Sequence, residues 1–308
     1  MSTPAKHNDP YQTVTDIIIE HLERGTVPWR CPWQCEIGIP RNFNTGKPYN
    51  GINVLLLGLR HQPSPYWLTF RQALERGGHV RKGERGAMVV KVGQFKPKGE
   101  DSAPIQNEGK EKKRNFLREY TVFNASQIEG IEFPTVSSTH ARNMDERITA
   151  AEQLVAAMPN CPSIHEGART MASYKMATDT VQMPAYGSFA NAESYYNTLF
   201  HELVHSTGHP ERLNRESLIK HDGFGGKEYS REELVAEMGA AFLGMEVDIV
   251  RDTHEQSAAY LQSWLEVLRA QEHKRWIINA ASQAAKAADF ILNRQRTADM
   301  HAEVQVTV

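Results

Sequence analysis

The sequence has little cysteine, no long apolar run and no apolar leader, and each absence excludes a class of protein. Its 308 residues hold three cysteines, an odd number without the paired spacing of a disulfide framework, so a small secreted protein held by disulfides is excluded. No apolar stretch approaches the roughly 20 residues of a membrane helix, and the polar N-terminus lacks the apolar core of a signal peptide. We therefore expect a cytoplasmic protein that works without a membrane.

Length and charge allow two domains with different partners. A chain of 308 residues is long enough for two domains of ordinary size, each with its own core. The net charge of −2 conceals an uneven distribution: residues 1–133 carry 19 Lys and Arg against 14 Asp and Glu, whereas residues 134–308 carry 16 against 23. A basic half joined to an acidic half suggests that the first half binds a polyanion. The excess is modest, so charge alone does not assign a partner.

Apolar periodicity and turn residues predict an α+β protein in two domains. We expect helices over residues 13–23, 70–76, 147–158, 191–206, 230–243, 255–270 and 273–292. We expect strands over residues 87–95, 120–123, 169–174 and 180–183, a charged loop over residues 96–118, and a short helix or strand over residues 52–59. A linker around residues 133–142 then separates a small mixed α/β domain, residues 10–133, from a helix-rich domain, residues 140–296.

One stretch of the second domain carries a chemical signature, His201-Glu202-Leu203-Val204-His205. Residues four apart on a helix share a face, so both imidazoles point the same way and can hold one metal ion. Glu202 stands one residue round the helix, where a carboxylate can act on a metal-bound water. Two histidines at this spacing are common on ordinary surface helices, but the intervening glutamate and the apolar flanks favour a zinc site.

A catalytic zinc site has three protein ligands and an open position, so a third ligand is needed. Glu233 and Glu237 lie four apart on the next predicted helix. Their spacing resembles the second helix of zinc peptidases that use a glutamate ligand, in which the first glutamate binds the metal and the later acid braces a ligating histidine. We favour Glu233 as the ligand and Glu237 as the brace. Glu237, Glu211 and His209 remain alternatives as the third ligand.

Such a site predicts hydrolysis of a peptide. Zinc lowers the pKa of its bound water toward neutrality, and Glu202 is placed to take the proton as general base and to pass it to the leaving amine. Another divalent metal could occupy the same ligands. The predicted strand over residues 180–183 could be an edge along which an extended peptide lies, and plain pairing within the core is an equally good interpretation.

The first domain mixes aromatic and basic residues in its loops, which is typical of proteins that bind single-stranded nucleic acid. Rings stack on bases while cations track phosphates, although single aromatics belong more often to a core. The candidate DNA-binding residues are Trp29, Arg30, Arg41, Phe43, Lys47, Tyr49, Arg81, Lys82 and Arg85. The predicted partner is therefore single-stranded DNA, with a protein substrate on that DNA as a second possibility.

Long motifs give the chain a family resemblance. Residues 41–56, 67–73, 78–86 and 120–127 resemble the N-terminal domain of ArdC-type antirestriction proteins, beginning with Arg41-Asn-Phe-Asn-Thr-Gly-Lys-Pro-Tyr-Asn-Gly51. Residues 201–213 and 232–243 resemble the zincin-like C-terminal domain of the same family. Together these motifs extend the resemblance over roughly residues 10–295.

The resemblance implies a plasmid-borne protein whose first domain binds single-stranded DNA and whose second is a zincin-like metallopeptidase domain. It implies protection of incoming plasmid DNA from host restriction endonucleases during conjugation. It does not settle whether the peptidase is active or what it cleaves. A DNA-dependent metalloprotease that cleaves DNA-bound proteins, or itself, is the alternative function.

Overall fold

The computed structural model describes residues 9–29, 38–95, 114–134, 144–167, 170–219, 227–249, 258–269 and 274–294. These residues form an α+β fold, which confirms the predicted class. The α-helices are α1 (Pro10–Glu23), α3 (Ile52–Gly58), α4 (Phe70–Glu75), α5 (Met144–Ala157), α6 (Ala192–Ser206), α7 (Glu216–Ile219), α8 (Lys227–Val247), α9 (Ala258–Arg269) and α10 (Trp276–Ile291). The strands are β1 (Arg41–Asn42), β2 (Tyr66–Thr69), β3 (His79–Val80), β4 (Ala87–Phe95), β5 (Arg114–Asn124), β6 (Ile128–Glu129), β7 (Ser163–Glu166), β8 (Ser173–Lys175) and β9 (Thr180–Met183).

The first half is built around a sheet with strand order β1-β2-β5-β4. β4 and β5 pair antiparallel from Ala87 opposite Val122 to Phe95 opposite Arg114. Residues 114–118, which we expected in a loop, therefore belong to β5, because their backbone pairs with the far end of β4. The remainder of that loop, including its lysines, lies outside the described residues. Thr69 ends β2 and caps α4 in a reciprocal capping box with Gln72.

The second half has a small sheet, order β7-β9-β8, placed before the helices. β9 pairs with β7 on one side and with β8 on the other. The interpretation of residues 180–183 as an edge strand is therefore wrong, because a central strand has no free edge for a peptide. β7 was not predicted; its residues are mostly exposed and lack an apolar alternation. α8 also starts earlier than expected, at Lys227 rather than at Ser230.

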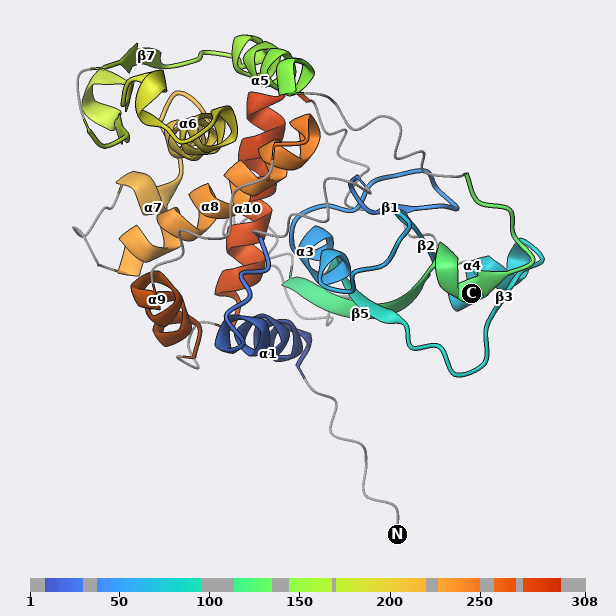
Figure 1. Ribbon diagram of the computed structural model, residues 1–308. Helices are drawn as coiled ribbons and strands as arrows, with labels where there is room; N and C mark the ends of the chain where they lie inside the picture. Colours follow the sequence, from blue (N-terminus) through green and yellow to red (C-terminus); the bar gives the residue numbers. More distant parts are fainter. Residues whose placement is uncertain are drawn as a thin grey trace, which may run out of the picture.

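One large cluster of buried apolar residues includes members from both halves of the chain, and two smaller clusters lie within the first half. α1 packs against α9 and α10, and the Thr15 hydroxyl donates a hydrogen bond to the carbonyl oxygen of Lys274 over 3.0 Å. Gly51, just before α3, adopts φ +53°, and a Cβ there would stand 3.4 Å from the Ala281 carbonyl oxygen of α10. Figure 1 shows α10, in red, with the sheet and α3 on one side and α6 and α8 on the other.

Among the described helices, none combines the length and the apolar character that crossing a bilayer requires. Most of the expected linker, residues 135–142 of 133–142, lies outside the described residues. The boundaries 10–133 and 140–296 therefore stay a prediction.

Candidate metal centre

The candidate metal centre forms where α6 and α8 pack against each other. Asn191 caps α6 by accepting a hydrogen bond from the backbone N–H of Ser194, and Leu199, Leu203 and Val204 bury one side of this helix. Gly239 of α8 allows close approach, since a Cβ there would come within 2.7 Å of the Val204 side chain. This contact brings the middle of α8 against the last two turns of α6.

Three donor groups converge at the crossing: His201, His205 and Glu233 each offer a ligand atom within 4.8 Å of the others. The Nε2 atoms of the two histidines are 3.1 Å apart. The Glu233 carboxylate lies 3.5 Å from Nε2 of His201 and 3.4 Å from Nε2 of His205. Ligands of a tetrahedral zinc ion, bonded at about 2.0–2.1 Å, stand about 3.3 Å apart. The observed separations therefore fit one metal ion in tetrahedral coordination.

Glu232 fixes the orientation of His205, a role that no motif in the sequence predicts. Glu232 is 2% exposed, and its carboxylate lies 3.3 Å from Nδ1 of His205. This contact directs Nε2 of His205 toward His201 and Glu233, as carboxylate partners do for metal-bound histidines. The only sequence signal was the acidic pair Glu232–Glu233, whose adjacent positions point in different directions on a helix.

Arg215 in turn holds Glu232. Its guanidinium donates from Nη2 to Oε1 of Glu232 over 2.5 Å and from Nε to Oε2 over 3.1 Å. It also donates to the carbonyl oxygen of Val204 at 2.6 Å and to the hydroxyl of Thr207, at the C-terminal end of α6. Ser217 donates a further hydrogen bond to Oε2 of Glu232 over 2.6 Å. The helix end and the His205 partner are thus fixed by one buried cation.

Glu237 lies near the other histidine, with its Oε1 atom 3.8 Å from Nδ1 of His201. That Nδ1 is buried and makes no direct hydrogen bond with any described group. Glu237 is therefore placed on the outer side of His201, away from the three converging ligand atoms. This position suits the predicted brace better than the alternative role of ligand.

Charge in the site favours a bound cation. Burial lowers the pKa of His205, but the carboxylates of Glu232 and Glu233 outweigh burial and raise this pKa to about 10. Burial raises the pKa of Glu232, but His205 and Arg215 outweigh it and lower this pKa to about 2. Burial likewise raises the pKa of Glu233, and its contacts with both histidines hold it well below the ordinary value. Carboxylates that stabilise an imidazolium also stabilise a metal ion at the same place.

The other residues predicted for the metal site are Glu202, Glu211 and His209. Glu202 is 8% exposed and follows His201 directly on α6. Glu211 is exposed, and its backbone N–H donates to Nδ1 of His209 over 3.2 Å. Neither Glu211 nor His209 joins the group of ligand atoms formed by the described residues. Chemically, the donor set of two imidazoles and one carboxylate matches catalytic zinc sites.

The predicted DNA-binding residues lie in different surroundings. Trp29 is only 3% exposed and packs edge-to-face on Trp264, with ring centroids 5.2 Å apart. Its predicted role in base stacking is therefore wrong, because the ring is part of the core between α1 and α9. Arg30 lies outside the described residues. Tyr49 is half-buried, and burial raises its pKa despite a contact with Asn42.

The other predicted residues remain accessible. Phe43 is half-buried beside Tyr66 and Phe133, with the guanidinium of Arg76 4.9 Å above its ring. Arg81 is exposed and pairs with Glu84 over 2.8 Å. The loop cations, defined as Arg41, Lys47, Lys82 and Arg85, are exposed and have no acidic partner among the residues that the structure describes.

Comparisons with known domains match both halves of the chain. The N-terminal domain of anti-restriction factor ArdC matches residues 8–123, and a zincin-like metallopeptidase domain matches residues 149–283. The metal-free crystal structure of the antirestriction ArdC protein from the R388 plasmid is 40% identical, with a TM-score of 0.74, over 94% of this chain and 100% of that chain. The Mn(II)-bound structure is 38% identical, with a TM-score of 0.71, over 96% and 100%.

Curated relatives are also similar over nearly the whole chain. The DNA primase TraC of Escherichia coli is 36% identical over 298 residues, covering 92% of this chain and 27% of the primase. The uncharacterized protein y4eC of Sinorhizobium fredii is 34% identical over 310 residues, covering 96% of this chain and 95% of y4eC. This chain thus spans about a quarter of that primase and nearly all of y4eC.

Proposed function

The chain belongs to the ArdC antirestriction family, and from this premise we propose that it binds single-stranded DNA and protects incoming plasmid DNA from host restriction endonucleases during conjugation. The observation that carries the DNA part is the set of loop cations. Exposed cations without acidic partners are available to phosphates, and binding that displaces counterions is expected from them. The accessible ring of Phe43 adds a surface on which a base can stack. We expect this activity in the cytoplasm, where the entering strand meets the restriction enzymes.

We further propose that His201, His205 and Glu233 bind a divalent metal, with zinc favoured by the donor set. A bound zinc ion would supply a polarised water at neutral pH. Glu202 would then hold the proton of that water as general base, and Glu237 would orient His201. Glu232 and Arg215 would orient His205. The second candidate function, a DNA-dependent metalloprotease acting on DNA-bound protein or on itself, is favoured by the complete set of ligand and bracing residues.

The substitution Glu202→Ala separates the two functions. A conjugation assay would count transconjugants of a plasmid carrying the protein in hosts with and without a restriction system. If binding is the function, Glu202→Ala keeps protection; if peptide hydrolysis is the function, protection is lost while metal and DNA still bind. An inactive wild-type protein in this assay would contradict the antirestriction role itself.

A salt-dependent titration tests the DNA claim directly. Fluorescence anisotropy with a labelled single-stranded oligonucleotide and its duplex would give affinities for both forms. We expect the single strand to bind more tightly and Lys82→Glu with Arg85→Glu to weaken that binding. Arg60→Glu is the matched control, because Arg60 is an exposed basic residue of the same half outside the candidate set. Equal affinity for the duplex would contradict strand specificity.

A further inference from the structure

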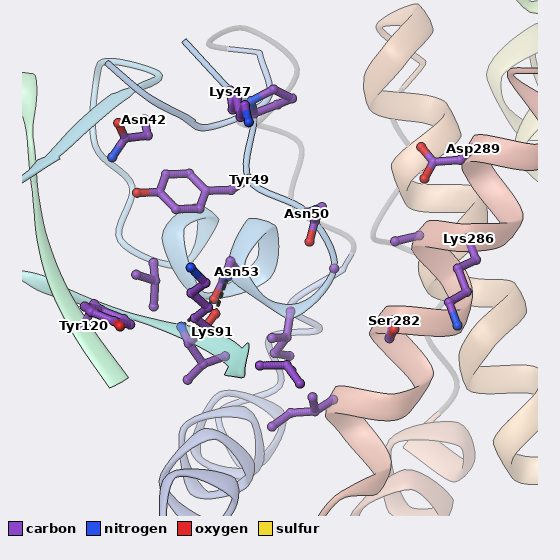
Figure 2. Close-up of a pocket in the computed structure, with 18 of the residues that line it drawn as sticks. Asn42, Lys47, Tyr49, Asn50, Asn53, Lys91, Tyr120, Ser282, Lys286 and Asp289 are labelled. Carbon is purple, nitrogen blue, oxygen red and sulfur yellow. Dashed lines mark hydrogen bonds between the residues drawn. The ribbon is translucent and has the colours of Figure 1, made fainter. Parts of the chain in front are cut away.

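A cleft of about 510 Å³ lies between the sheet of the first half and α10 of the second. Figure 2 shows its two walls, with Tyr49, Tyr120 and Lys91 on the side of the sheet and Ser282 and Lys286 on α10. No candidate metal ligand lines it. This volume falls within the roughly 300–1,000 Å³ of small-molecule sites, which suits a nucleotide and excludes a base-paired duplex.

Side-chain hydrogen bonds to the backbone fix the wall of the cleft on the side of the sheet. The Asn53 side chain donates to the carbonyl oxygen of Val90 and accepts from the backbone N–H of Val90, both over 2.8 Å. The Asn42 side chain accepts from two backbone N–H groups of the following turn and donates to Gln72 over 3.0 Å. These contacts fix the backbone on the side of the sheet, where the half-buried ring of Tyr49 lies beside Asn42 and that of Tyr120 lies near Lys91 (Figure 2).

The charge of the cleft is predominantly positive. Lys47, Lys91, Lys286 and Arg294 line it against a single acidic residue, Asp289. Arg294 already pairs with Glu246 through two contacts of 2.5 and 2.6 Å. Lys47 and Lys286 are exposed, and their ammonium groups form no ion pair with any acid in the described part of the chain. One such lysine stands on each wall.

We propose that a segment of single-stranded DNA binds in this cleft, so that both halves of the protein hold one strand. The aromatic rings of Tyr49 and Tyr120 contact the bases, and Lys47 and Lys286 contact the phosphates. Aromatic rings beside cations in a groove are the general solution for binding a strand without reading its sequence. The inference rests on the proposed DNA binding and adds a site, because α10 belongs to the half that matches a metallopeptidase domain.

Placing the strand on α10 has a structural consequence. α10 packs against both α6 and α8, the helices that carry the candidate metal ligands. A strand in the cleft therefore contacts the helix that supports the metal centre. DNA binding and the metal centre are then two functions of one packed unit, although the loop cations and the ligands belong to different halves.

Substitutions on α10 test the site without disturbing a core. Lys286→Ala removes the cation and Ser282→Glu adds an anion one helical turn away; both positions are exposed. The matched control is Lys175→Glu, which changes the charge of β8 outside the cleft. Anisotropy titrations would use oligothymidylate of about 16 nucleotides, the upper range of a single-strand site. Circular dichroism would verify that each variant is folded.

Loss of one phosphate contact reduces the slope of log affinity against log salt by about 0.7 for a single strand. Between about 50 and 200 mM salt, the wild-type affinity should therefore fall roughly 2.6-fold more than that of Lys286→Ala. Ser282→Glu should weaken binding, and Lys175→Glu should leave affinity and slope unchanged. If the wild type binds and Lys286→Ala retains its slope, the cleft proposal is overturned while DNA binding stands. If the wild type does not bind, the proposed function fails first.

Photocrosslinking locates the bases independently. Oligothymidylate containing 5-iodouracil would be irradiated on the full-length protein, and the crosslinked peptides would be identified by mass spectrometry. Crosslinks at Tyr49 or Tyr120 are the expected result. Crosslinks confined to the loops around Phe43 and residues 81–85 would overturn the proposal, because they would place the strand outside the cleft.

Discussion

The buried pair of Arg215 and Glu232 gives the sharpest test of how the candidate metal centre is built. We predict that Arg215→Met destabilises the protein and weakens metal binding, although Arg215 is no metal ligand. Both side chains are about 3% exposed and are joined by two hydrogen bonds. Methionine preserves the length and apolar stem of the side chain and removes every donor.

The magnitude follows from burial. Removing one partner of a buried ion pair costs about 3–5 kcal/mol, because the Glu232 carboxylate stays buried away from water and loses its counterion. The protonated ring of His205, whose Nδ1 atom lies 3.3 Å from Glu232, partly neutralises that carboxylate. We therefore expect a loss of stability at the lower end of the 3–5 kcal/mol range, about 3 kcal/mol. Such a loss is a large share of the roughly 5–15 kcal/mol that stabilises a typical domain. Without Arg215, Glu232 also loses the contacts that hold it against Nδ1 of His205. His205 is then oriented less firmly toward the other ligands, which reduces metal affinity by about 10–100-fold.

Urea denaturation of the chelator-treated protein would give the free energy of unfolding, and competition with a chromophoric chelator would give zinc affinity. The double variant Arg215→Met with Glu232→Gln completes the thermodynamic cycle. It should be more stable than the sum of the single losses predicts, because the buried Glu232 carboxylate without its counterion is then absent. Purely additive losses, or a cost below about 1 kcal/mol for Arg215→Met, would refute the view that Arg215 acts by neutralising Glu232.

Three further predictions concern other parts of the fold. Glu233→Gln should reduce zinc affinity by more than the roughly 10–100-fold expected of a bracing residue such as Glu237, as measured by the same chelator competition on both variants. Gly51→Ala should cost about 1–3 kcal/mol in urea denaturation, because the residue must keep φ +53° against α10. Asp179 has its pKa lowered, chiefly by hydrogen bonds from Arg212, so it adds stability above its unfolded pKa of about 3.9. That stability is lost as pH falls through the folded pKa; the urea midpoint of Asp179→Asn should therefore approach that of the wild type in acid, and a constant difference would contradict this.

The elements that follow a clear local pattern could be predicted from the sequence. The β4 boundaries, the Thr69 cap and the extent of α6 match the expectations, because alternation, capping residues and helical spacing act within a few residues. β7 could not be predicted, since its four residues lack an apolar alternation and depend on pairing with β9. The position of β9 within its sheet also depends on strands distant in the sequence.

In the candidate metal site, too, local spacing predicted some residues, while others depend on contacts between distant segments. Spacing alone brought His201, Glu202 and His205 onto one helix, and the structure places Glu233 with the two histidines. The brace of His205 was missed because Glu232 is held in place by Arg215, which the chain supplies from the irregular segment between α6 and α8. No periodic pattern marks a residue in such a segment.

Trp29 shows why aromatic and basic composition identifies a binding surface only in part. The Trp29-Arg30 pair resembled a stacking ring beside a cation, yet the ring packs on Trp264, more than two hundred residues away in sequence. Conversely, Tyr120 and Lys286 lay in segments that looked like an ordinary strand and a packing helix, and they line the cleft only because α10 packs beside the sheet. A binding site shared by two halves of a chain is thus invisible to a search of either half. If the cleft holds DNA, α10 connects the loop cations of the first half with the candidate metal centre on α6 and α8.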